Sequence, residues 1–143
     1  MNILRWLSVA LLLLNGIAAC FGGYALVHDP SGAAVQLSPD LLHNTPFATY
    51  LIPGIILLVV IGVGNIVVAT LAAVNTSQYP KLIAASGCIL VGWIAAQILM
   101  IRILFFLHYV IGGIGVTLIA LGTIQWMMRT PDRRNRTNLN GAS

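Results

Sequence analysis

Charged side chains are scarce in this chain: Asp, Glu, Lys and Arg together make up 7% of its 143 residues. A soluble domain carries roughly 25% charged residues. Because 59% of the residues are hydrophobic and the mean hydropathy is +0.96, the chain has too few polar side chains to cover a surface that faces water. The composition therefore excludes an ordinary soluble domain and predicts a surface that faces lipid.

Acidic residues are the rarest charged type, with three Asp or Glu against seven Lys or Arg and a formal net charge of +4. None of the acids lies inside a long apolar run, which argues against a proton-coupled pump or transporter. The basic residues stand mostly at the edges of the apolar runs, where they orient a membrane protein. The positive charge therefore does not indicate a nucleic-acid partner.

Cysteine occurs twice, as Cys20 and Cys88, each within a long apolar run. Two thiols without a CxxC pair provide no disulfide framework. Buried cysteine usually behaves as a small hydrophobic residue, and we expect that role for both. A redox function would require the two side chains to be neighbours.

Long apolar runs dominate the chain, and a membrane-spanning helix needs about 20 mainly apolar residues. Segments of alternating polarity, as in a membrane β-barrel, are lacking. The last apolar stretch is too long for a single span, so we place a turn in it near residues 106–109. The sequence thus predicts an all-α fold, an integral membrane four-helix bundle over residues 1–128. Its four spans are expected at about residues 4–27, 47–74, 82–105 and 108–128.

Small residues recur within every predicted span. Helices in lipid associate through close packing and internal hydrogen bonds, so small residues should mark the faces where two helices meet. The glycines that we expect at such contacts are Gly22, Gly23, Gly54, Gly62, Gly64, Gly87, Gly92, Gly112, Gly113, Gly115 and Gly122.

The distribution of Lys and Arg predicts the orientation of the four spans. One side of the membrane receives a single cation, Arg102, and the other side receives six: Arg5, Lys81, Arg129, Arg133, Arg134 and Arg136. Since the cytoplasmic side carries the excess of basic residues, we expect both termini to be cytoplasmic, the arrangement called N-in/C-in. Residues 129–143 are basic and polar, which predicts a disordered cytoplasmic tail close to anionic lipid.

One alternative concerns residues 1–20, which combine a basic start and an apolar core with the tetrapeptide Ile17-Ala18-Ala19-Cys20. This tetrapeptide looks like a bacterial lipoprotein cleavage box, and cleavage there would leave three spans and a lipidated Cys20. The apolar stretch continues through Val27, which suits a retained helix better than a signal peptide. We therefore expect the first span to be retained.

The longest connection covers residues 28–46 and joins the first two spans on the extracytoplasmic side. Residues 29–32, Asp-Pro-Ser-Gly, form a turn signal with proline at the second position. Ser38 is placed to cap a short helix that has Pro39 in its first position and Asp40 in its first turn. The sequence predicts a folded extracytoplasmic loop that acts as a lid, and not a flexible linker.

Most of the titratable side chains fall on this extracytoplasmic side. Three interpretations stay open: a polar cap that fixes the loop to the bundle, a site for a lipid headgroup or small molecule beneath the loop, and a metal site. No HxH or HExxH spacing supports the metal site, and no G-x-S-x-G setting indicates a nucleophile. Arg102 can either extend toward the interface or pair with one of the acids. The candidate ligand-binding residues are His28, Asp29, Asp40, His43, Arg102 and His108.

Polar residues inside the spans form a second candidate set, because polar groups in the membrane require partners. They are Asn15, Asn65, Trp93 and Gln97. These side chains either form hydrogen bonds between helices or line a site for a ligand.

The residues 29–32 (Asp-Pro-Ser-Gly), 45–47 (Thr-Pro-Phe) and 50–54 (Tyr-Leu-Ile-Pro-Gly) make up a loop and helix-two pattern. With this pattern the sequence resembles a group of small, uncharacterised bacterial four-span membrane proteins. The resemblance covers the first span through the fourth and implies a setting in the bacterial inner membrane. It carries over no activity, cofactor or catalytic residue. The layout is also loosely similar to that of DoxX-like four-helix proteins, at the level of the fold alone.

No motif identifies a reaction, and the sequence names no cofactor. We expect a non-enzymatic protein that binds lipid or another lipophilic ligand, or an accessory subunit of a larger membrane complex. The first alternative is a membrane oxidoreductase or other enzyme that uses the extracytoplasmic histidines with haem, quinone or metal. The second alternative is a channel or transporter formed by a homo-oligomer.

Overall fold

A computed structural model of the chain describes residues 2–102 and 104–140, and the regular structure in these ranges is entirely helical. The second membrane span is made of three consecutive helices, and two short 3-10 helices lie in the loop before it. The elements in chain order are α1 Asn2–His28, η1 Ala33–Val35, η2 Pro39–Leu42, α2 Leu51–Ile56, η3 Leu57–Val63, α3 Gly64–Ala73, α4 Tyr79–Ile101 and α5 Phe106–Asn140.

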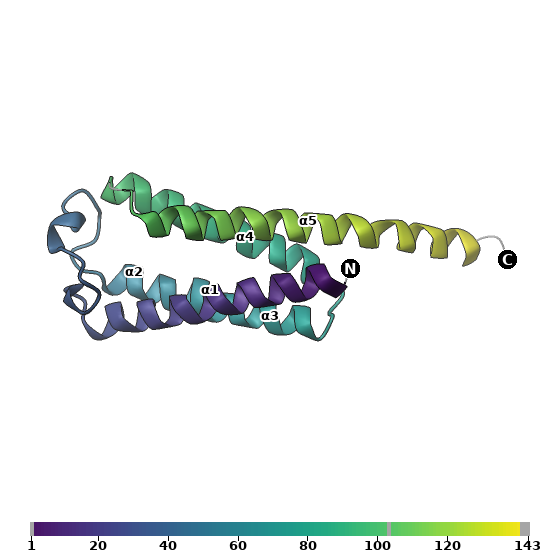
Figure 1. Cartoon of the computed structure of the whole chain (residues 1–143), viewed down its shortest axis with the longest axis horizontal. Helices are drawn as coiled ribbons and strands as arrows, with labels where there is room; N and C mark the ends of the chain where they lie inside the picture. The colour runs from purple at the N-terminus through teal and green to yellow at the C-terminus, as the bar shows by residue number, and fades with distance from the viewer. Residues whose placement is uncertain (1, 103, 141–143) are drawn as a thin grey trace.

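Four helical stretches of the structure are long and apolar enough to cross a membrane: Asn2–His28, Leu51–Ala73, Tyr79–Leu99 and Phe106–Arg129. They lie alongside one another as a bundle (Figure 1). The prediction of an all-α four-helix membrane bundle is therefore confirmed, and the chain is a multi-pass membrane protein.

The fourth span begins at Phe106, earlier in the chain than predicted. The helix α4 ends because Arg102 adopts a left-handed conformation, with φ 56°, and its backbone N–H bonds to the Ile98 carbonyl at 2.9 Å. The helix α5 begins where the Nδ1 atom of His108 accepts the backbone N–H of Phe105 at 3.1 Å. Side-chain capping by His108 thus places the fourth span at Phe106.

The C-terminal segment also differs from the expectation. A disordered tail was predicted from Arg129, whereas α5 continues through Asn140 (Figure 1). Residues 141–143 of the predicted tail lie outside the described residues. Extending an existing helix avoids the cost of nucleating a new one, and arginine is a good helix former. The composition of this segment indicated exposure to water, but exposure does not exclude a helix.

The four spans form two hairpins, each held by glycines at its internal contact. In the first hairpin, α1 packs against the second span: a Cβ atom on Gly23 would lie 2.5 Å from the Leu58 nitrogen. In the second hairpin, α4 packs against α5: a Cβ atom on Gly87 would lie 2.6 Å from the Gly115 carbonyl oxygen. The predicted role at helix contacts is confirmed for Gly23, Gly87 and Gly115, and each of these contacts lies within a hairpin. It is wrong for Gly92 and Gly113, where a Cβ atom would meet nothing within 4 Å.

The two hairpins meet mainly at the end of the bundle that carries the N-terminus, here called the N-terminal end (Figure 1). The Gln125 Nε2 atom in α5 donates to the Ser8 hydroxyl in α1 at 3.0 Å. The Arg129 guanidinium in α5 donates to the carbonyl oxygens of the turn between α3 and α4 and lies over the Tyr79 ring. The apolar cluster at this end comprises Val9, Leu12, Ala69, Ala72, Tyr79, Ile83 and Leu118.

The loop between the first two spans is folded at the opposite end, here called the loop end. The N–H of Gly32 bonds to the Asp29 carbonyl at 3.1 Å, which closes the predicted turn. The Ser38 hydroxyl accepts the Asp40 N–H at 3.2 Å, and Pro39 begins η2, as predicted. The predicted turn and helix cap are therefore confirmed.

Tyr50 connects this loop to the second span. Its hydroxyl donates to the Ser38 carbonyl at 2.8 Å, and its backbone N–H bonds to the Pro30 carbonyl at 2.9 Å. Burial raises the pKa of the Tyr50 phenol, so the phenol stays protonated and keeps this donor. At the far side of the loop, η2 contacts α4, so the loop extends from one hairpin to the other.

Candidate functional site

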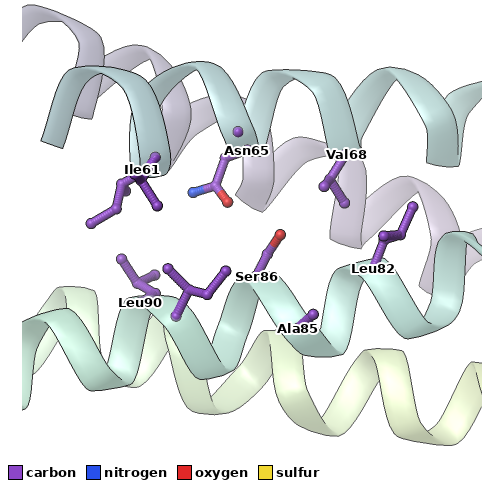
Figure 2. A pocket seen from close by; sticks show the side chains of 10 residues that line it. Ile61, Asn65, Val68, Leu82, Ala85, Ser86 and Leu90 are labelled. Carbon is purple, nitrogen blue, oxygen red and sulfur yellow. The ribbon is translucent and has the colours of Figure 1, made fainter. Parts of the chain in front are cut away.

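A cavity of about 140 Å³ lies between the second and third spans. One wall comes from η3 and α3 and the other from α4 (Figure 2). The wall at η3 is a π-helix, a wider turn that occurs in short stretches and often at functional sites. The lining residues are Val60, Ile61, Gly64, Asn65, Val68, Leu82, Ala85, Ser86, Ile89 and Leu90.

Two of the lining side chains are polar, and they come from opposite walls. Asn65 is 4% exposed and Ser86 is 7% exposed. The Asn65 carboxamide and the Ser86 hydroxyl point toward one another across the space between the two helices (Figure 2). The Nδ2 atom of Asn65 is buried and has no hydrogen-bond partner. A buried donor without an acceptor costs about 1–3 kcal/mol, so this amide is free to bind a further group.

The cavity reaches the outer surface of the bundle between α3 and α4. Val60 and Ile89 line it and are about half exposed, at 46% and 49%. Ala85 also lines it and is exposed. These residues belong to spanning helices, so the cavity opens sideways at the surface of the bundle.

The interior of the bundle closes the cavity on its other side. Ala19, Ile61 and Leu90 form a buried apolar cluster, and Trp93 packs against that cluster. Asn15 lies on the same face of α1 as Ala19 and is buried, and its Nδ2 atom also has no partner. Asn15 and Asn65 lie at similar depth, because a Cβ atom on Gly16 would lie 3.3 Å from the Asn65 Cβ.

The predicted intramembrane polar residues do not form one hydrogen-bonded network. Among the described residues, no hydrogen bond links Asn15 or Asn65 to Gln97 or to another helix. Gln97 is half-buried farther along α4, toward the loop end. Asn65 forms no hydrogen bond to the facing helix because the cavity separates the two.

A buried hydrogen bond between helices occurs instead at a pair that sequence reasoning missed. Gln125 and Ser8 are fully buried, and the Gln125 Nε2 atom donates to the Ser8 hydroxyl and to its own helix at the Leu121 carbonyl. The signal was present, because Gln125 is the only amide side chain within the predicted span 108–128. Its partner could not be identified, since a serine inside an apolar helix usually bonds to its own backbone, as Ser8 also does at the Leu4 carbonyl.

The two acids at the loop end have local partners. The Asp29 carboxylate accepts the Ser31 hydroxyl at 2.6 Å and the Ala34 N–H at 3.0 Å. Asp40 lies 3.6 Å from His43, and both side chains are largely exposed. Among the described residues, Arg102 forms no ion pair with either acid, so the suggested pairing that would fix the loop is not formed.

The remaining two histidines lie on different helices. His28 stacks on Tyr24 at the end of α1, with ring centroids 5.9 Å apart. His108 is 8% exposed, stacks on Phe105 and accepts the Phe105 N–H. Within residues 2–102 and 104–140, the structure contains no group of three or more His, Cys, Asp or Glu side chains that could hold a metal ion. That the six predicted residues bind a ligand stays a prediction. Among the described residues, the interactions between members of this set are those of Asp40 with His43 and of Asp29 with His28, which are close in the sequence.

Comparison of the chain with protein-family models, with curated proteins and with solved structures gives no match.

Proposed function

We propose that this multi-pass membrane protein is a non-enzymatic protein that binds a lipophilic molecule in the cavity between its second and third spans. The observation that carries the proposal is a mainly apolar cavity, open toward lipid, with the unpartnered Asn65 amide in its wall. Ligand sites combine an apolar lining with a few placed polar groups in this way.

The size of the cavity indicates how such a molecule is held. An apolar cavity of about 150 Å³ accommodates a molecule the size of benzene, and this cavity measures about 140 Å³. A membrane lipid or other lipophilic ligand is larger than that. One ring or short segment therefore occupies the cavity, and the rest lies in the lipid beside Val60 and Ile89.

The orientation and location of the bundle belong to the same proposal. The excess of Lys and Arg near the N-terminal end supports the N-in/C-in arrangement. The location proposed for the bundle is the bacterial inner membrane, on the sequence pattern of residues 29–32, 45–47 and 50–54 alone. In this arrangement the loop end is extracytoplasmic, and a lipophilic molecule reaches the cavity sideways from the bilayer.

The substitution Ala85→Leu tests this proposal, because Ala85 lines the cavity and a leucine side chain would fill it. The protein is purified from membranes in mild detergent, and the lipophilic molecules that copurify are extracted and quantified by mass spectrometry. We expect the wild type to retain a defined molecule near one per chain and Ala85→Leu to lose most of it. The matched control is Ala95→Leu, the same change at an exposed position of α4 outside the cavity, which should retain it. Equal retention by the two variants would overturn the proposal.

A further inference from the structure

We infer that the molecule in the cavity is uncharged and carries a hydrogen-bond acceptor, such as a carbonyl oxygen, which the Asn65 Nδ2 atom binds. This inference rests on the proposed function and assigns the chemical class of the ligand. It also assigns to Asn65 and Ser86 the role of specificity-determining residues.

The charge of the lining excludes an ionic group. None of the ten lining residues is charged, and Asn65 and Ser86 are the polar ones. A carboxylate, phosphate or ammonium taken from water to this depth would lose its hydration and meet no opposite charge. The group that enters the cavity is therefore neutral.

The unpartnered donor argues against a plain hydrocarbon. A hydrocarbon segment would fill the cavity and leave the Nδ2 atom of Asn65 buried without an acceptor, which is unfavourable in a medium that offers no water. A carbonyl, ester or ether oxygen would satisfy that donor. The Ser86 hydroxyl points toward the same space from the opposite wall (Figure 2) and supplies a second donor for the same oxygen.

The position of Asn65 favours an acceptor within the body of the ligand. Asn65 lies at the depth of Gly16, near the middle of α1, so the acceptor sits deep in the hydrocarbon layer. A headgroup at the membrane surface does not reach this depth. The class that fits is a small carbonyl-bearing ring or chain segment with an apolar remainder that lies in the lipid.

A matched pair of probes tests this assignment: 4-decylcyclohexanone, which carries the acceptor, and decylcyclohexane, which has the same ring and chain without it. Each is titrated into the full-length protein in lipid nanodiscs, and binding is followed by NMR at the methyl groups of Val68 and Leu90. These reporters line the cavity and are unchanged in every variant. The side-chain N–H signals of Asn65 are followed in parallel.

We expect the ketone to saturate the Val68 and Leu90 signals and to bind about tenfold more tightly than decylcyclohexane. The Asn65→Leu substitution should remove this preference, and Ser86→Ala should reduce it. The control Thr70→Val removes a hydroxyl from the exposed face of the same helix, where it bonds to the Ile66 carbonyl at 2.9 Å. That variant should keep the preference.

The outcomes separate this inference from the proposed function. If both probes saturate with equal affinity, or Asn65→Leu binds the ketone as the wild type does, the cavity binds hydrocarbon and the assigned class is overturned while the proposed function stands. A bound water detected at the Asn65 amide in the presence of the ketone would overturn the assignment in the same way. If neither probe saturates the signals of the wild type, both are overturned.

Discussion

Buried polar side chains in this bundle differ in whether they have partners. The Gln125 amide donates to Ser8 and to its own helix, and hydrogen bonds of this kind between membrane helices contribute about 0.6 kcal/mol. The Nδ2 atoms of Asn15 and Asn65 donate to no group in the described residues. The contacts of the Gln125 Nε2 atom thus explain a structural role for it, while its buried Oε1 atom accepts from no group in the described residues. Asn65 lines a cavity, and its contacts do not explain why an amide is buried there. A ligand that accepts a hydrogen bond from Asn65 would explain it.

Protonation of Asp29 should release part of the loop. The hydrogen bond from the Ser31 hydroxyl, together with those from the backbone N–H groups of Ala34 and Ser31, lowers the pKa of Asp29 from its ordinary value of 3.8. Because the pKa is lower in the folded state, the contribution to stability is present above pH 3.8 and is lost as the pH falls through the lowered pKa. We expect the Ala34 amide resonance to move toward its unbonded position only in that acidic range.

NMR spectra of the full-length protein recorded from neutral to acidic pH provide the measurement. The variant Asp29→Asn should show no such titration at Ala34, whereas Asp40→Asn should behave as the wild type. The Asp40 carboxylate accepts from the Ser38 hydroxyl and not from Ala34. An Ala34 resonance that does not move with pH in the wild type would contradict the role given to Asp29.

At the scale of the helices, glycine sets how closely α4 and α5 approach. A Cβ atom on Gly87 would lie 2.6 Å from the Gly115 carbonyl oxygen and 2.8 Å from the Ile119 nitrogen. Both neighbours are backbone atoms and can make room only if the two helices separate. We expect Gly87→Ala to destabilise the protein by about 1–3 kcal/mol, measured by unfolding in mixed micelles with increasing dodecyl sulfate.

The control for this prediction is Gly92→Ala on the same helix, because a Cβ atom at Gly92 would meet nothing within 4 Å. This variant should unfold at the wild-type midpoint or slightly above it, since alanine is the better helix former. Equal destabilisation by the two substitutions would show that close packing at Gly87 does not hold the hairpin together.

The helices were the part of the structure that the sequence predicted best. Long apolar runs and the turn chemistry of residues 29–32 and 38–40 act locally, so the four spans and the loop turns could be read from composition and spacing. The start of the fourth span was misplaced because His108 caps α5 by a side-chain hydrogen bond. Hydropathy does not report such a bond. The helical continuation of α5 was missed for a similar reason, since polar composition indicates exposure and not conformation.

The candidate site could be predicted only in part. Asn65 was singled out from its place in an apolar run, but Ser86 was not, because serine is common in membrane helices and often bonds to its own backbone. The cavity itself depends on how α4 lies against α3 across the boundary between the hairpins. The separation of α3 and α4 is a property of tertiary packing, and the sequence of a single span does not determine it. The titratable residues of the loop end attracted attention by their chemistry, yet most of their contacts are local.

At the scale of the whole molecule, the cavity lies at the boundary between two hairpins that are each tightly packed. In the described residues, two side chains of α5 donate hydrogen bonds to the first hairpin or to the turn between the hairpins: Gln125 and Arg129. Both lie at the N-terminal end. Removing both donors should therefore let the hairpins separate while each hairpin stays intact. We expect this of the double variant Gln125→Leu with Arg129→Gln.

Electron–electron distance measurements on spin-labelled protein check this expectation, with Cys20 and Cys88 replaced by alanine. Labels at Leu14 and Val116, which are exposed on α1 and α5, report the distance between the hairpins, and its distribution should broaden in the double variant. Labels at Ile89 and Val116 report the distance within the second hairpin and should keep their narrow distribution. Broadening of both pairs would mean that the bundle unfolds as one unit. An unchanged distance between the hairpins would mean that the apolar cluster around Leu12 and Leu118 is sufficient to join them.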